Sequence, residues 1–157
     1  MLGVHFAITG DQERLLLNAD DETLGDLLED IEENWPYHDP KLDTDKAWDA
    51  IHRCLGDGTL SPDGPAYPLS HAVLGGRHMH DEIYVVHVTA TEVQDVAEAL
   101  QPITKTWIRT RYNAIDDPDY SPHNEKDFEY TWANFTDMQA FYERAAKAQR
   151  AVIFTAT

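Results

Sequence analysis

Three segments of the chain carry the apolar pattern of β-strands. Residues 2–9 alternate apolar and less apolar side chains, the period-two pattern of a strand with one buried face. Residues 82–88 gather valines around His87, and residues 151–156 lack polar alternation, as in strands that are buried on both faces. The sequence therefore predicts strands at the beginning, in the middle and at the end of the chain.

Other segments repeat apolar side chains at the three- and four-residue spacing of amphipathic helices. Thr89 with Glu92, and Thr136 with Gln139, have the capping-box spacing that opens a helix. The expected helices cover residues 20–35, 44–55 and 89–100, a segment that starts near residue 102, a stretch through residues 128–132, and a helix that opens at residue 136. Residues 69–76 are expected to form a short helical turn or a loop.

This order of elements predicts the fold class. Three strands separated by helices place both ends of the chain in one sheet with helices packed on it. A length of 157 residues suits one core, and no Gly-, Ser- or Pro-rich tract is long enough to link two domains. We expect residues 1–157 to form a single α+β domain with a small central sheet of about three strands.

The charge of the chain excludes several classes of function. There are 12 Lys and Arg residues against 29 Asp and Glu residues, a formal net charge of −17. Nucleic acids and anionic membranes bind basic side chains, so neither is an expected partner. No apolar run reaches the roughly 20 residues that cross a bilayer, and the first residues lack the basic flank of a secretory signal. The single cysteine, Cys54, excludes an internal disulfide framework, so we expect a cytoplasmic protein.

Much of the negative charge lies in the first third of the chain. Residues 11–45 hold thirteen acids against Arg14 and Lys41, a net charge of −11. Such a stretch is either a solvated helix face, an adaptation to salt, or a docking face for a basic protein partner. The acidic residues expected on the docking face are Asp21, Glu22, Asp26, Glu29, Asp30, Glu32 and Glu33.

Histidines supply a candidate metal site. His78 and His80 alternate along an extended segment and so project the same way, Asp81 follows directly, and His87 or His71 would add a further ligand for tetrahedral zinc. The H-x-H spacing is less specific than paired cysteines, and the other interpretation is a polar loop before a strand. We expect no cofactor, with zinc at these residues as the alternative. Residues 117–128 do not match a calcium loop, because proline replaces its glycine and phenylalanine its final glutamate.

A second candidate site involves Trp48 and His52, which share one helix face four residues apart. With the segment Pro68–Gly76 they would line a pocket whose other candidates are Ser70, His71, Gly75 and Gly76. The alternative is that His52 is a core residue. Ser70 and His71 are adjacent and so are not expected to face one another, and Cys54 is expected to be a small buried residue. No nucleophile elbow, phosphate-binding loop or dinucleotide fingerprint is present.

Four segments together resemble a known family. They are Leu42–His52, Pro68–Gly76, Val88–Val93 and Phe135–Ala146, and in this order they are similar to the YfbM-like family of small bacterial proteins, a family of unknown function. The resemblance covers nearly the whole chain. It implies a single α+β domain and a bacterial cytosolic protein, and it brings no activity, cofactor or catalytic residue. His71 and residues 78–80 depart from the family pattern, so a site built on them would be particular to this protein.

Three functional hypotheses follow. The first is a cytosolic binding protein whose acidic face docks a basic protein partner. The second is a small-molecule enzyme or sensor that uses the pocket around Trp48 and His52, with or without a metal. The third is a homodimer joined through aromatic surface at Trp132, Phe135 and Tyr142, in place of a monomer. The sequence leaves open whether the protein is an enzyme.

Overall fold

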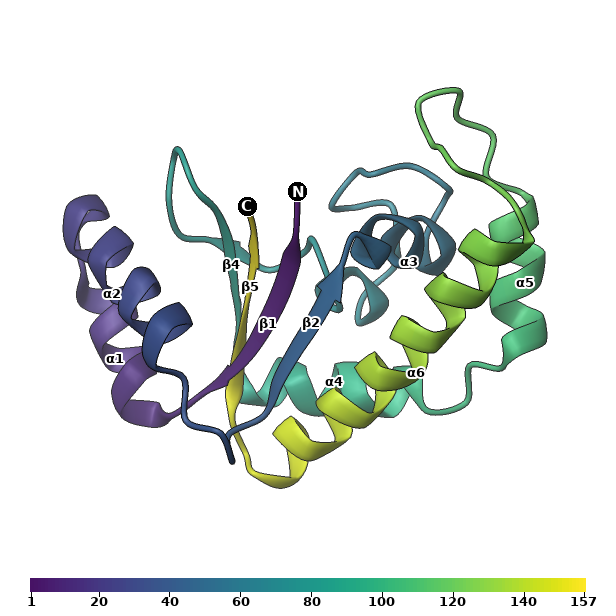
Figure 1. Ribbon diagram of the computed structural model, residues 1–157. Coiled ribbons are helices and arrows are strands. Elements are labelled where there is room, and N and C mark those ends of the chain that lie inside the picture. Colours follow the sequence, from purple (N-terminus) through teal and green to yellow (C-terminus); the bar gives the residue numbers. More distant parts are fainter.

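A five-stranded antiparallel sheet organises the computed structural model, which describes residues 1–157 (Figure 1). The strand order is β2-β1-β5-β4-β3. The strands are β1 (Gly3–Ile8), β2 (Lys41–Asp45), β3 (Arg77–His78), β4 (Tyr84–Val88) and β5 (Ala151–Ala156). The first and last strands pair along their whole length, from Gly3 opposite Ala156 to Ile8 opposite Ala151. This confirms the α+β class and places both ends of the chain in the sheet.

Helices cover both faces of this sheet. Helices α1 (Gly10–Asn18) and α2 (Asp21–Asn34) pack on one face over Phe6, Ile8 and Ile153. The opposite face carries the larger core of 29 buried residues under α3 (Ala47–Leu55), α4 (Ala90–Leu100), α5 (Lys105–Asn113) and α6 (Glu125–Lys147). A short 3₁₀ turn, η1 (Leu69–His71), lies against α4. Strand β1 is therefore buried on both faces, where one buried face was expected.

The two edge strands were not predicted. Strand β2 ends on Thr44 and Asp45, which were expected to open the second helix, and that helix begins only at Ala47. The strand gives only a short apolar–polar alternation, because just two of its residues, Leu42 and Thr44, are buried between exposed charged residues. Asp45 takes a left-handed conformation with φ of 50°, which separates the strand from the helix. Strand β3 has only two residues, too few to give a pattern.

Two differences concern helices. Helix α1 was not predicted, because its three consecutive leucines lack helical periodicity, although Thr9 and Gln12 form a capping box at its start. The helix expected to open at Thr136 does not begin there, since α6 runs unbroken through this residue. The Thr136 hydroxyl donates to the carbonyl of Ala133 within the helix. A capping-box sequence thus does not start a helix where apolar periodicity continues on both sides.

The aromatic residues proposed for a dimer interface do not form a surface. Phe135 and Tyr142 are fully buried in the core beneath α6, and Trp132 stacks on Phe135. The Tyr142 hydroxyl donates to the carbonyl of Ala72 at 2.8 Å. These side chains stabilise the protomer itself, so the predicted interface is wrong. None of the helices is both long enough and apolar enough to span a bilayer.

Candidate functional site

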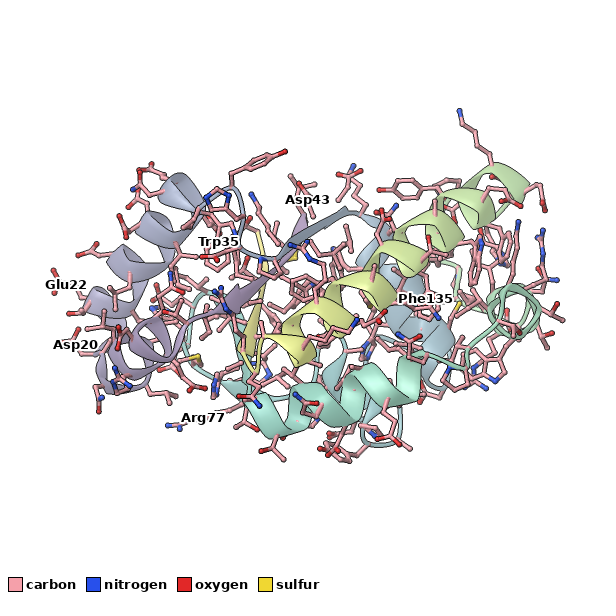
Figure 2. The ribbon with its side chains drawn as sticks, turned by 90° about the horizontal axis from the view of Figure 1, so that it is seen from below. Asp20, Glu22, Trp35, Asp43, Arg77 and Phe135 are labelled. Atoms are coloured by element: carbon pink, nitrogen blue, oxygen red, sulfur yellow. The ribbon has the colours of Figure 1, made fainter.

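The outer surface of α2 is a continuous acidic face. All seven predicted residues are exposed: Asp21, Glu22, Asp26, Glu29, Asp30, Glu32 and Glu33, called the docking face below. None of them forms an ion pair. Figure 2 shows Asp20 and Glu22 projecting away from the sheet, while Trp35 at the other end of α2 lies toward it, its ring 5.0 Å from that of Phe6.

The acidic side chains of α2 stabilise its first turn and destabilise its last turn. The Asp20 carboxylate caps the helix by accepting from the amide of Thr23 at 2.8 Å, and this hydrogen bond lowers the pKa of Asp20. Acids near this end complement the helix dipole. Glu32 and Glu33 lie in the last turn, where carboxylates face the negative end of the dipole and no basic residue is present. Glu32 and Glu33 therefore cost the isolated protein stability.

Several acidic residues outside α2 are paired within the fold. Outside α2, basic side chains pair with acids: Lys105 with Glu129, Arg109 with Glu125, Lys147 with Glu143, Arg150 with Asp39, and Arg14 with Asp11. Arg111 instead donates to the backbone carbonyls of Cys54 and Gly56, and Arg144 to that of His38. Helix α2 contains no Lys or Arg, and Lys41 and Arg144 line a cavity with its Glu32 and Glu33 without forming an ion pair to them.

An apolar groove runs beside the docking face. Leu15, Ala19 and Leu27 line a cavity of about 570 Å³ between α1 and α2, together with Arg14 and Thr23. Leu15 is 59% exposed, one of few large apolar side chains at the surface. The groove thus has an apolar floor with a polar rim of Asp11, Arg14, Asn18 and Thr23. Sequence reasoning missed it because it depends on how two helices pack.

The candidate metal ligands are not brought together. His78 pairs with Val86 and Arg77 with His87 in the β3–β4 ladder, so His78 and His87 point to opposite faces of the sheet. His78 packs against the ring of Tyr84. His87 is buried under α1, where its Nε2 lies 2.7 Å from a carboxylate oxygen of Glu13. His87 thus links the sheet to α1 and is separated from the other candidates.

The hydrogen bonds of His80 also disfavour zinc. Its Nδ1 accepts from the backbone amides of Glu82 and Ile83, both at 3.0 Å. The proton of the neutral ring therefore lies on Nε2, which leaves neither nitrogen with a free lone pair for a metal. Asp81 makes no hydrogen bond to this ring. No group of three or more His, Cys, Asp or Glu side chains in the structure is placed to hold a metal ion.

Trp48 and His52 do not share a pocket. The Trp48 indole donates to the carbonyl of Met1 at 3.0 Å, at the end of β1. The His52 ring, one turn further along α3, is fully buried, with Nε2 2.6 Å from the carbonyl of Ser61. Burial lowers the pKa of His52, so the ring is neutral and Nε2 donates this bond. The core interpretation of His52 fits this geometry.

Ser70 and His71 interact with each other, contrary to expectation. In the 3₁₀ turn the Ser70 hydroxyl lies 2.8 Å from Nδ1 of His71, and Nε2 of His71 lies 3.1 Å from Glu92. The other oxygen of Glu92 accepts from the amide of Thr89 in the capping box of α4. None of the main cavities of the protein is lined by Ser70, His71 or Glu92. The network fixes the turn to α4.

Gly75 and Gly76 allow the backbone after the 3₁₀ turn to pack closely against Ser70 and His87. A side chain on Gly75 would place its Cβ 2.2 Å from the backbone oxygen of Ser70, and Gly76 has a φ of 130° beside the carbonyl of His87. We expect Gly75→Ala to lower the free energy of unfolding by about 2 kcal/mol, because the backbone must shift to remove the clash. Urea unfolding checks this. An unchanged midpoint would show that the turn moves freely.

One polar network was missed by sequence reasoning. The Arg53 side chain is 5% exposed and bonds Asp49 and Asp117, both at 2.7 Å, and the carbonyl of Gly58. The four-residue spacing of Asp49 and Arg53 was the available signal. Asp117, considered only for calcium, instead fixes the loop before α6 onto α3. Cys54 is buried as predicted, and burial raises the pKa of its thiol to about 12.

Comparison with known proteins gives a family and a fold. The family model described as "Domain of unknown function (DUF1877)" matches residues 1–155. A comparison with curated protein sequences finds no match. Among solved structures, a protein of unknown function from Escherichia coli, YfbM, superposes with a TM-score of 0.74 at 19% identity over 100% of both chains. The predicted resemblance is thereby confirmed, and this chain belongs to the DUF1877, or YfbM-like, family.

Proposed function

We propose that the protein is an interaction protein whose docking face binds a basic protein partner. The charge of α2 carries the proposal, since the helix contains no Lys or Arg and none of its seven exposed carboxylates forms an ion pair. Like charges one turn apart weaken a helix. A partner that presents lysine or arginine side chains would relieve this repulsion, so binding recovers stability that the free protein lacks.

The groove beside α2 defines the rest of the partner. Leu15 and Leu27 leave apolar surface that an aliphatic or aromatic side chain would cover. A segment with basic residues around an apolar anchor matches both features. In such interfaces the charges set association rate and specificity, while the buried anchor supplies most of the affinity.

Neutralising one stripe of the docking face tests this function. Asp26→Asn, Asp30→Asn and Glu33→Gln together should weaken partner binding about tenfold, since three exposed charge pairs at about 0.5 kcal/mol each are lost. The wild-type protein serves as bait in an extract of its source cells at about 0.05 M salt. The recovered partner is then purified, and its dissociation constant is measured by calorimetry with both proteins.

A charge-matched variant is the control. Asp63→Asn, Glu98→Gln and Asp137→Asn remove three exposed acids outside α2 that form no ion pair. The control should bind the partner as the wild type does. Raising the salt to about 0.5 M shortens the screening length roughly threefold and should weaken the wild-type complex. Equal binding by both variants, or binding indifferent to salt, would refute the docking face.

A further inference from the structure

The loop between β3 and β4 is held together by one imidazole ring. Residues 79–83 form neither helix nor strand, and a hydrogen bond from the amide of Met79 to the carbonyl of Val85 closes the loop at 3.1 Å. The amides of Glu82 and Ile83 donate to no backbone carbonyl. Both donate to Nδ1 of His80 at 3.0 Å. The His80 ring thus takes the place of a backbone acceptor inside the loop.

This hydrogen bonding requires a neutral His80 ring. Backbone amides can only donate, so Nδ1 must offer its lone pair to both of them. A proton on Nδ1 turns this acceptor into a donor, whose N–H then points at the amides of Glu82 and Ile83. Both amides lose their partner together. Histidine is the side chain that ordinarily changes its charge between about pH 5 and pH 8, so a fall in pH acts on this contact.

The loop packs against helix α2 through two apolar side chains. Met79 and Ile83 are half-buried against the smaller core cluster, to which α2 contributes Leu24. The Cδ1 atom of Ile83 lies 4.0 Å from the position that a Cβ atom on Gly25 would take, which is a van der Waals contact. In Figure 1 the loop leaves the sheet on the side of α2. Ile83 thus joins the two contacts, since its amide binds His80 and its side chain lies over α2.

The charged groups around the His80 ring are mainly acidic. A cavity of about 500 Å³ opens beside the ring. Its other titratable residues are His78, Asp81, Glu82 and Tyr84, with Met1 and Thr157 at the ends of the chain. The one basic side chain of β3, Arg77, lies outside this cavity. On α2 the positions around Gly25 carry Glu22, Asp26 and Glu29. A proton that reaches the ring therefore meets carboxylates and no Lys or Arg side chain.

We propose that His80 is a pH-sensitive switch that holds the β3–β4 loop against α2. With the ring neutral, the loop is closed and Ile83 covers Gly25. When Nδ1 takes up one proton from solvent, the hydrogen bonds to Glu82 and Ile83 break and the loop moves away from α2. A lower pH then leaves the docking helix without this neighbour and weakens binding there. That last consequence rests on the proposed function, whereas the opening of the loop does not.

Nuclear magnetic resonance of the free protein tests the switch. The ring nitrogen shifts of His80 report its protonation, and the amide signals of Glu82 and Ile83 report the hydrogen bonds. Between about pH 7.5 and about pH 5 both amides should shift with the midpoint of the ring. Their protection from hydrogen exchange, corrected for the intrinsic effect of pH, should fall about tenfold because each loses one hydrogen bond. The nuclear Overhauser contact between Ile83 and Gly25 should disappear.

Three variants separate the ring from its surroundings. In His80→Asn the loop should stay closed at both pH values, because an asparagine oxygen accepts from amides two residues on and does not titrate. In His80→Ala the acceptor is lost, so the loop should be open even at about pH 7.5. His78→Gln is the matched control, since His78 lines the same cavity without binding these amides, and its loop should respond to pH like the wild type.

Two results would overturn the switch. One is a loop that keeps its amide protection and its contact with Gly25 while the His80 ring is protonated. The other is loss of protection at about pH 5 in His80→Asn, because another group would then be responsible. The effect on docking is measured separately with the captured partner, which the wild type should bind severalfold more weakly at about pH 5.5 than at about pH 7, and His80→Asn less so. Equal weakening in both would exclude control of docking by the loop, while the resonance experiment on the free protein decides the switch itself.

Discussion

Lowering the pH from about 7 to about 4 should reduce the free energy of unfolding by about 3 kcal/mol through His5 alone. This side chain is fully buried against Phe141, Tyr142 and Phe154, and burial lowers its pKa from 6.5 to about 4. Below pH 6.5 His5 is protonated in the unfolded chain but stays neutral in the folded protein. The free energy of unfolding therefore falls until about pH 4 and then levels off. Each unit of pKa difference is worth about 1.4 kcal/mol.

His5→Phe should reduce the fall in the free energy of unfolding at acid pH while keeping the fold. The Nε2–H of His5 donates to the carbonyl of Ala72 at 2.8 Å, but that oxygen also accepts from Tyr142, so it stays paired in the variant. The ring nitrogen Nδ1, buried without a partner, is removed. Urea unfolding from about pH 7 to about pH 4.5 measures the effect, with exposed His38→Gln as a control. A wild-type pH profile in His5→Phe would exclude His5 as the cause.

Arg53→Met should lower the free energy of unfolding by about 3 kcal/mol. The substitution keeps the apolar stem and removes the charge that Asp49 and Asp117 share on α3. The hydrogen bond from Arg53 holds the pKa of Asp117 below its usual value, and its loss leaves two carboxylates facing each other. Both carboxylates are about one-third exposed, so the cost lies at the lower end of the range for broken buried pairs.

The matched control for Arg53 is a surface ion pair. Arg109 bonds Glu125 through two nitrogens at 2.6 and 2.7 Å, but this carboxylate is mostly exposed. Arg109→Met should therefore cost much less than Arg53→Met. Chemical denaturation compares both variants with the wild type. Equal losses would mean that the burial of Arg53 adds nothing to its ion pairs.

The central strands were predictable because both of their faces are buried. Strands β4 and β5 are runs of apolar residues, and such runs are recognisable without knowledge of their neighbours. The edge strand β2 buries only Leu42 and Thr44, which also suits the start of a helix. Its assignment depends on pairing with β1, a contact between residues about forty positions apart.

The candidate sites divide along the same line. The docking face was predictable because acids on the outer side of one amphipathic helix must meet solvent. The predicted histidine cluster does not form. Successive side chains of a strand point to opposite faces of the sheet, and a buried histidine finds its hydrogen-bond partner in a distant segment, as His87 does in Glu13. The cavity that joins Asp45 to Tyr120 and Asp127 was missed, because nothing local connects these residues.

Hydrogen exchange of the protein with its captured basic partner tests the docking face most directly. If the partner binds there, backbone amides in residues 10–34 should exchange more slowly in the complex, and the protection should disappear in the Asp26→Asn, Asp30→Asn, Glu33→Gln variant. Exchange elsewhere, including α6, should stay unchanged. Protection confined to other segments, with residues 10–34 exchanging as in the free protein, would contradict the proposed function.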